Sequence, residues 1–247
     1  MYKEHPVFEK PGNENATIWR YVDFTKFVSL LDKKTLFFAR ADRLGDPFEG
    51  SYSKANVKLR AEVYKDKIPP NVLKDIGQIW EQFIRLTAIN CWHLNEYESA
   101  AMWKLYLKSN EGIAIRSSFN RLKSCFKDEN HDIHIGRVKY IDYEKDWMPE
   151  GNSFYPFIHK RKSFEHEQEL RAIIQKFSYK KNGEINLSKP PFDDGIYVQV
   201  DLDVLVNKIY VAPTSPQWLL GLIKSVTKVY KLDKEVLQST LDDVPVY

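Results

Sequence analysis

The sequence predicts an α+β fold, in which a central, mostly antiparallel sheet is flanked by helices and carries a helical insertion. Two observations predict it. Short apolar segments typical of strands recur along the chain, and between them apolar residues repeat at intervals of three and four, as on one face of a helix. With 247 residues, 43% of them hydrophobic, the chain can bury a substantial core. We expect an irregular arm at residues 1–17 and a single domain at residues 18–247.

The first elements form a strand–helix–strand unit. Residues 18–22 read as a strand, Asp23 is a typical N-cap residue, and residues 35–41 read as a second strand. The helix between them carries an apolar stripe of Phe24, Phe27, Val28 and Leu31.

A dense turn signal follows at residues 42–50, DRLGDPFEG. Gly45, Asp46 and Pro47 together specify a turn. The acids Asp46 and Glu49 could face a functional site or could complete the hydrogen bonds of the turn, and the sequence leaves both readings open.

The next segment, residues 53–86, is polar and helical in pattern. Pro69 and Pro70 must separate it into two helices, because proline interrupts a helix and restricts the residue before it. We expect this helical pair to be an insertion between strands. Residues 86–92 then read as a third strand, which leads into His93.

A helix is predicted at residues 99–108. Asn95 and Glu98 have the spacing of a capping box, and Asn110 with Gly112 would end the helix. Its core-facing residues are expected to be Met102, Leu105 and Tyr106, with Trp103 and Leu107 adjacent.

The rest of the chain continues the mixed pattern. Strands are predicted at residues 112–117, 133–143, 196–200 and 208–211, and helices at residues 119–126 and 217–230. The apolar face of the last helix comprises Leu219, Leu220, Ile223, Val226 and Val229. Residues 180–194 are expected to form a loop, and the tail from residue 237 stays unassigned.

Residues 154–174 carry the strongest functional signal. A basic run at residues 159–162 leads into three carboxylates at alternate positions, Glu165, Glu167 and Glu169. This spacing decides which acids can act together, because strands alternate their faces whereas helices align residues four apart.

On a strand, Glu165, Glu167 and Glu169 would share one face with Arg171, whereas on a helix the middle acid would turn away. We expect helix up to about Phe164 and strand from Glu167. A solvated charged face with local ion pairs explains these charged residues equally well.

Composition and missing motifs exclude several classes. The net charge of +3 is too small to predict nucleic-acid binding, and the two cysteines lack the spacing of a disulfide scaffold or zinc site. No signal peptide or membrane span is indicated, so we expect a cytoplasmic protein without a membrane partner. The motifs of P-loop, dinucleotide-binding, zincin and lipase-type enzymes are missing. Nothing in the sequence indicates the oligomeric state.

Two histidine-containing groups are weaker candidates. Cys91 and His93 would share a strand face, which allows a Cys–His nucleophile pair, although a buried structural thiol explains the cysteine better. His131 and His134 could bind a metal with Asp132, but a loop-to-strand junction explains them equally well. We therefore assign no metal site.

Four blocks resemble an uncharacterised bacterial family, the domain of unknown function 2971. They are an aromatic strand and helix with a DPFEG turn (residues 19–50), a CWH–ES–MW block (91–103), a GIAI strand (112–117) and a basic–F–E–x–E–R block (160–174). In this order they span most of residues 18–175. The resemblance implies no established activity.

The layout is also similar to that of NAD-dependent ADP-ribosyltransferases, which begin with a strand bearing a polar residue, a helix and a second strand, and complete the site with a late glutamate. The corresponding residues here are Arg20, Tyr21, Phe37, Phe38, Glu167 and Glu169. The chain departs from that pattern where Arg20 and Tyr21 stand in place of a histidine, and where Ala39 replaces a serine or threonine.

This similarity implies that NAD is a substrate whose nicotinamide–ribose bond is cleaved. Glu169 is the expected catalytic carboxylate, with Glu167 second, because a carboxylate can stabilise an oxocarbenium-like state. The residues expected to bind NAD are Arg20, Tyr21, Phe38, Arg171 and His93. The site is expected where the DPFEG turn, the loop at 93–98 and residues 167–171 meet.

Two other classes stay open. A non-catalytic domain, acting in bacterial antiphage defence or stress, would recognise a nucleic acid or a protein. Its phosphate contacts would be Lys160, Arg161, Lys176 and Lys180. Metal-assisted phosphodiester cleavage would instead require Asp46, Glu49 and Glu169 to converge.

Overall fold

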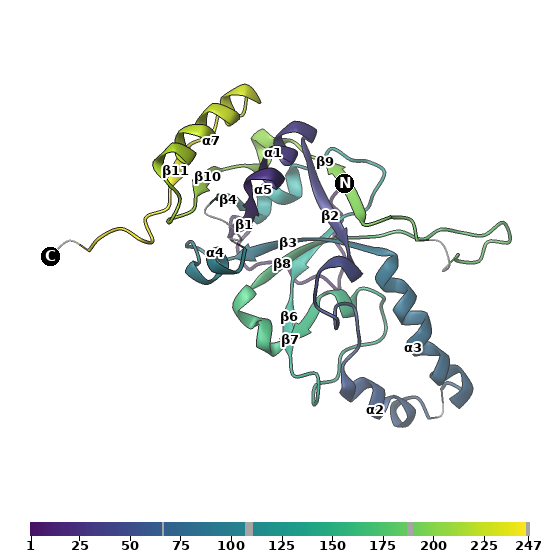
Figure 1. The fold of residues 1–247 in the computed structure, drawn as a ribbon. Helices are drawn as coiled ribbons and strands as arrows, with labels where there is room; N and C mark the ends of the chain where they lie inside the picture. Colours follow the sequence, from purple (N-terminus) through teal and green to yellow (C-terminus); the bar gives the residue numbers. More distant parts are fainter. Residues whose placement is uncertain (66, 107–110, 187–189, 246–247) are drawn as a thin grey trace.

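One large, mostly antiparallel sheet with helices on both faces forms the centre of the protein, which confirms the predicted α+β fold (Figure 1). The computed structural model describes residues 1–65, 67–106, 111–186 and 190–245. The strands are β1 (Thr17–Asp23), β2 (Thr35–Arg40), β3 (Thr87–Leu94), β4 (Gly112–Ser118), β5 (His134–Arg137), β6 (Lys139–Ile141), β7 (His159–Arg161), β8 (Glu169–Gln175), β9 (Gly195–Gln199), β10 (Lys208–Val211) and β11 (Val236–Gln238).

The helices lie between these strands along the chain. They are α1 (Phe24–Lys33), α2 (Lys54–Val63), α3 (Pro70–Arg85), α4 (Ala100–Tyr106), α5 (Phe119–Ser124), α6 (Leu202–Leu205) and α7 (Gln217–Val229). Three short 3₁₀ segments are η1 (Ala41–Arg43), η2 (Tyr155–Phe157) and η3 (Lys162–Glu167).

The sheet runs in the order β11-β10-β4-β1-β3-β2-β9, and β8 with β5 continues it from the other edge of β3. Neighbouring strands are antiparallel except β10 and β11. Strands β6 and β7 form a separate parallel pair beside the sheet (Figure 1).

Two strands share one edge of β3, and this arrangement creates the site described below. Strand β1 pairs with the C-terminal end of β3 at His93 and Leu94, and β2 pairs with its N-terminal end at Ala88 and Ile89. Among the described residues, the middle of β3 pairs only with β8 on its opposite edge. Strands β1 and β2 therefore splay apart and leave an opening in the sheet.

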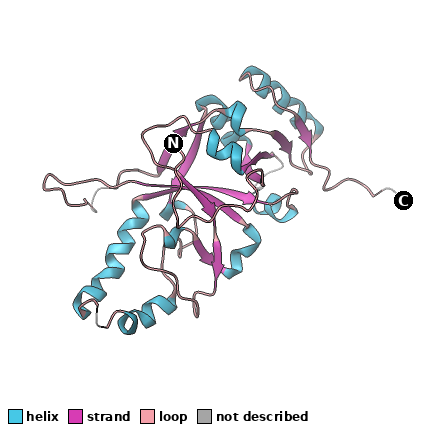
Figure 2. Ribbon diagram, turned by 180° about the vertical axis from the view of Figure 1, so that it is seen from behind, coloured by secondary structure: helices cyan, strands magenta, loops and turns pink. Residues whose placement is uncertain are grey.

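Each face of the sheet is covered by a different layer. One face packs against α1, α5, α6 and α7 through a core that contains Phe27, Phe119, Leu205 and Ile223. The opposite face is covered by α4, through Met102 and Trp103, and by α3 together with the N-terminal arm. Figure 2 shows these layers from behind.

The predicted first unit and the helical insertion are both present. Asp23 caps α1 by accepting a hydrogen bond from the Lys26 amide. The insertion contains α2 and α3, and Pro70 occupies the first turn of α3, where its missing N–H costs nothing. The two helices project from the rest of the molecule (Figures 1 and 2).

Other boundaries differ from the prediction. The segment 133–143 is not one strand: β5 joins the large sheet, whereas β6 pairs with β7. The α-helix expected up to Phe164 is not formed, because residues 155–167 contain only the 3₁₀ segments η2 and η3 and the strand β7. The late strand starts at Glu169 rather than Glu167, since Gln168 adopts a left-handed conformation that breaks the extended chain. Strand β11 and helix α6 were not predicted.

Helix α4 begins one residue later than predicted, and its predicted core face is right only in part: Met102 is buried. The Met102 amide donates to Ser99 Oγ, so Ser99 caps the helix in place of Asn95. Leu105 and Tyr106 are exposed rather than in the core. Leu107 and Asn110 lie outside the described residues.

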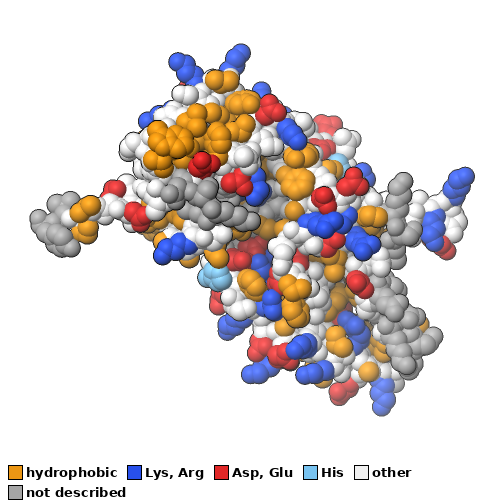
Figure 3. Space-filling model, in the orientation of Figure 1, with side chains coloured by type: hydrophobic (Ala, Val, Ile, Leu, Met, Phe, Trp, Pro, Cys, Tyr) orange, Lys and Arg blue, Asp and Glu red, His pale blue; other side chains and the backbone are white. Residues whose placement is uncertain are grey.

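Helix α7 exposes more apolar surface than expected. Val229, predicted on its buried face, is 74% exposed, while Leu219 and Ile223 are buried. Trp218 and Leu222 are also exposed on this helix, over which Figure 3 shows hydrophobic side chains gathered.

Candidate functional site

A cavity of about 790 Å³ lies at the opening between β1 and β2. Its walls come from β1, β2, β3, α1, α4, β9 and the segment around Glu167 and Glu169. This volume lies in the range of sites that enclose a ligand of drug or nucleotide size. The residues that line the cavity come from elements about 150 residues apart in sequence, such as Arg20 and Glu169, so only the fold brings them together.

Five of the seven residues predicted for the site line this cavity. They are Arg20, Tyr21, His93, Glu167 and Glu169. The other two do not line it: Phe38 is fully buried in the core, and Arg171 lies behind Glu169 with only 1% of its side chain exposed. The structure therefore gives no support to the binding roles predicted for these two residues.

Arg20 bridges the opening in the sheet. Its Nη1 donates a 2.8 Å hydrogen bond to the main-chain carbonyl oxygen of Cys91, in the middle of β3, and its guanidinium lies 5.8 Å from the ring centre of Trp92. No carboxylate among the described residues forms an ion pair with it. A half-buried arginine without an acidic partner on a cavity wall is suited to an anionic ligand.

Glu169 is held by two cations. Its Oε1 accepts a 2.7 Å hydrogen bond from Lys160 Nζ, and its Oε2 accepts one of 2.7 Å from Arg171 Nε. Burial alone would raise the pKa of Glu169, but the charges of Arg171 and Lys160 outweigh it and keep this pKa well below its usual value. Glu169 is therefore a fixed negative charge at neutral pH.

Glu167 behaves differently, although only one residue separates it from Glu169. Burial and the hydrogen bond and charge of Glu169 raise the pKa of Glu167 to about 7, against the opposing effect of Lys160, whose Nζ also contacts it. The two carboxylates thus share Lys160 but differ in protonation. One is a permanent anion and the other can exchange a proton near neutral pH.

His93 lies on the cavity wall with one nitrogen engaged. Its Nδ1 lies 2.7 Å from the main-chain oxygen of Glu167, and because a carbonyl can only accept, Nδ1 carries the hydrogen. Burial lowers the pKa of His93, so the ring is neutral. Its Nε2 is buried and has no hydrogen-bond partner among the described residues.

Aromatic rings flank the cavity on both sides. The Tyr21 ring stacks on Tyr106 from α4 with centroids 6.4 Å apart, and burial raises the pKa of Tyr21 to about 12. Across the opening, the rings of Phe37 and Tyr197 lie 4.9 Å apart. Tyr106, which was predicted in the core, and Tyr197, which was not predicted for the site, both line the cavity. Alternation of side chains along β2 was the one signal that could have favoured Phe37 over Phe38.

Cys91 also lines the cavity but is a poor nucleophile. Burial, and then the charge of Glu169, raise the pKa of its thiol, which disfavours the reactive thiolate. Since the one engaged nitrogen of His93 contacts a main-chain oxygen instead, no Cys–His pair is formed. The nucleophile hypothesis therefore has no geometric support.

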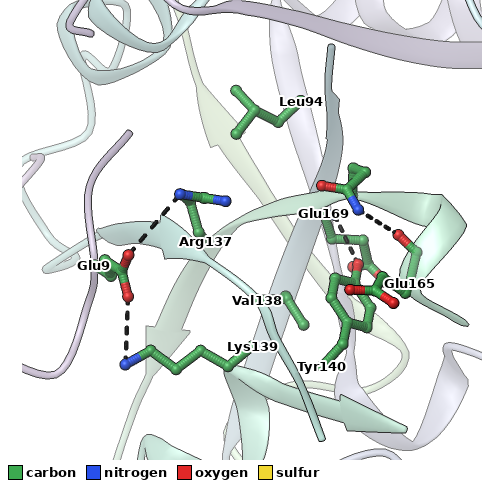
Figure 4. A pocket seen from close by; sticks show the side chains of 9 residues that line it. Glu9, Leu94, Arg137, Val138, Lys139, Tyr140, Glu165 and Glu169 are labelled. Atoms are coloured by element: carbon green, nitrogen blue, oxygen red, sulfur yellow. Dashed lines mark hydrogen bonds and ion pairs between the residues drawn. The ribbon is translucent and has the colours of Figure 1, made fainter. Parts of the chain in front are cut away.

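A second, smaller cavity of about 290 Å³ lies beside the first, and Glu169 lines both. Figure 4 shows Glu9 on one side, where it contacts Arg137 and Lys139 at 3.9 and 3.3 Å. On the other side the Tyr140 hydroxyl accepts a hydrogen bond from the Glu169 amide. Its lining charges Glu9, Arg137, Lys139 and Glu169 are already paired, so it offers less free binding capacity than the large cavity.

Most of the side chains expected to contact phosphates already form ion pairs within the protein. Lys160 is buried between Glu167 and Glu169, and Arg161 forms an ion pair with Asp46 at 2.8 Å. Lys180 pairs with Glu184 on the surface. The face in Figure 3 intersperses basic and acidic side chains, rather than presenting one basic surface.

The acids proposed to bind a metal converge only in part. Glu49 and Glu169 do meet, but at the guanidinium of Arg171 instead of a metal, and Asp46 is paired with Arg161. Across the described ranges, no group of three potential ligands is placed to hold a metal ion. The predicted His131, His134 and Asp132 do not converge either: they contact Asp128, the main chain of Lys3 and the Lys3 amine, respectively.

Within the part of the chain that the structure describes, no helix combines the length and the apolar character that crossing a membrane requires. Comparison of the chain with models of protein families, with curated proteins and with solved structures finds no match. The function must therefore be inferred from the geometry of the cavity.

Proposed function

We propose that the large cavity binds NAD and that the protein cleaves the nicotinamide–ribose bond, as ADP-ribosyltransferase-like enzymes do. The observation that carries this proposal is that Arg20 and the Glu167–Glu169 carboxylates, which are some 150 residues apart, line one cavity. This combination provides a cation for a pyrophosphate and an anion for an electron-poor sugar.

The size and lining of the cavity support a dinucleotide. Ring pairs flank the opening on both sides, Tyr21 with Tyr106 and Phe37 with Tyr197, and can pack against two heterocycles. Arg20 lies at the opening between them, where the pyrophosphate of an extended NAD molecule would lie. A single small substrate would leave most of this lining unused.

The carboxylates support the chemistry. Loss of nicotinamide leaves positive charge on the ribose ring, which a nearby anion stabilises. Glu169 is a suitable anion, because Arg171 and Lys160 hold it ionised and immobile before the substrate binds. Preorganised charge of this kind does not have to reorient during the reaction.

Release of nicotinamide from NAD tests the proposal. We expect turnover by the unaltered protein, and a loss of about 100-fold or more in Glu169→Gln, since the developing charge then lacks its anion. Glu165→Gln is the matched control, because Glu165 belongs to the same run of acids but is exposed and does not line the large cavity. Absence of turnover in the unaltered protein at millimolar NAD, or an equal loss in both variants, would contradict the proposal.

A further inference from the structure

We infer that His93 is the base that accepts the proton of the second substrate, and that this substrate is a neutral hydroxyl group, either water or an alcohol. The inference rests on the proposed cleavage of NAD and names the acceptor class and a residue that contacts it. It is carried by the position of His93 on the cavity wall and by its unpaired nitrogen.

The hydrogen bond at Nδ1 fixes the tautomer of His93. Nδ1 donates to the Glu167 main-chain oxygen at 2.7 Å, so a neutral ring leaves the lone pair on Nε2. His93 as a whole is 4% exposed, and Nε2 has no partner among the described residues. A buried acceptor without a partner destabilises the protein, and a ligand donor would relieve that cost.

His93 lies next to the proposed catalytic carboxylate. His93 lies directly opposite Glu169 in the antiparallel pairing of β3 with β8, so both side chains point to the same face. Side chains opposite each other have Cβ atoms roughly 5 Å apart. The Tyr21 ring closes the other side, with its centroid 6.3 Å from that of His93. The base is thus adjacent to the anion that would stabilise the ribose.

The neutral imidazole limits the class of acceptor that can react. A hydroxyl keeps a lone pair while it is protonated, and its proton becomes acidic only as the new bond forms, so a weak base such as neutral imidazole is sufficient. A guanidinium or ammonium group has no free lone pair until a much stronger base removes its proton. A carboxylate acceptor has no proton to lose. A neutral histidine therefore matches a hydroxyl acceptor.

The reaction then balances without another reactant. The bond between ribose C1′ and the nicotinamide nitrogen breaks, and its electron pair leaves with nicotinamide, which becomes neutral. The acceptor oxygen forms a bond to C1′, and its proton passes to Nε2 of His93. The resulting imidazolium is stabilised at Nδ1 by the Glu167 carbonyl and later returns its proton to solvent.

The experiment measures nicotinamide release and NAD binding for His93→Gln. Glutamine can still donate to the Glu167 carbonyl but cannot act as a base, so we expect turnover to fall about 100-fold while the Kd for NAD changes less than threefold. His159→Gln is the matched control. His159 is also buried, also contacts a main-chain oxygen through Nδ1, at 2.7 Å, and is not on the cavity wall. It should retain turnover.

A second measurement does not depend on any variant. With methanol and guanidine as competing acceptors, the unaltered protein should form methyl ADP-ribose and no guanidine adduct. The inference is overturned if His93→Gln keeps its turnover, if it loses NAD binding together with turnover, or if guanidine is the acceptor that reacts. A lack of NAD turnover in the unaltered protein would overturn the proposed function as well.

Discussion

Arg171 and Glu49 form a two-point ion pair in which no more than 3% of either side chain is exposed. The distances are 2.6 Å from Nη1 to Oε1 and 2.8 Å from Nη2 to Oε2, between residues 122 positions apart. The same guanidinium binds Glu169 through Nε. The pair thus attaches the DPFEG turn to β8 and supports the carboxylate that lines the cavity.

Glu49→Gln should destabilise the protein strongly. Removal of one partner leaves the charge of Arg171 undercompensated in a buried site, and such changes cost about 3–5 kcal/mol. Urea unfolding measures this loss. Asp132→Asn is the control: its ion pair with Lys3 has both side chains more than half exposed, and its loss should change the free energy by less than about 1 kcal/mol. Equal effects would show that the buried pair contributes no more than the exposed one.

Gln168 should be sensitive to side-chain shape. Its φ and ψ are 40° and 54°, the left-handed conformation that separates Glu167 from Glu169. A β-branched residue is strained there, so Gln168→Val should lose about 1–2 kcal/mol, whereas Gln168→Gly should stay within about 1 kcal/mol. Glu165→Val is the control, because Glu165 is an exposed neighbour with ordinary φ. A larger loss with glycine than with valine would disprove the conformational argument.

Stability should depend on the titration of Glu167. Its pKa in the folded protein is about 7, above the reference value of 4.5, so the folded state binds this proton more tightly. The resulting stabilisation is complete below pH 4.5 and is lost as the pH rises to about 7. Glu169, whose pKa is lowered, contributes in the opposite sense, and its stabilisation is lost only at more acidic pH.

Comparison with Glu167→Gln isolates this effect. Between pH 5 and 8, the free energy of unfolding of the unaltered protein should fall relative to that of the variant by on the order of 2 kcal/mol. Urea unfolding at several pH values gives this difference. If it is constant across that interval, Glu167 does not titrate near neutral pH.

Much of the fold could be predicted because its elements carry local patterns. The cap at Asp23, the proline break at Pro69 and Pro70 and the strand at residues 112–117 each depend on neighbouring residues only. The break between β5 and β6 could not be predicted, since it depends on which distant strand each one joins. Short strands such as β11 lack enough periodicity to be recognised.

The site was predictable only in part for the same reason. The carboxylates stood out by their spacing, but the partner of Arg171 is Glu49, which only the fold brings near. Phe38 was chosen for binding, yet alternation along β2 buries it in the core and leaves Phe37 on the cavity wall. The opening between β1 and β2 follows from strand registers that no local pattern encodes.

The most direct test of the account is calorimetric titration of NAD into the unaltered protein, Arg20→Ala and Arg116→Ala. Arg116 is a matched control, because it is also half-buried and also lies 5.8 Å from a tryptophan ring centre, but it does not line the cavity. We predict that the unaltered protein and Arg116→Ala bind NAD alike, and that Arg20→Ala binds at least 10-fold more weakly, a loss of about 1.4 kcal/mol. No binding to the unaltered protein at millimolar NAD, or equal affinity in Arg20→Ala, would contradict the account.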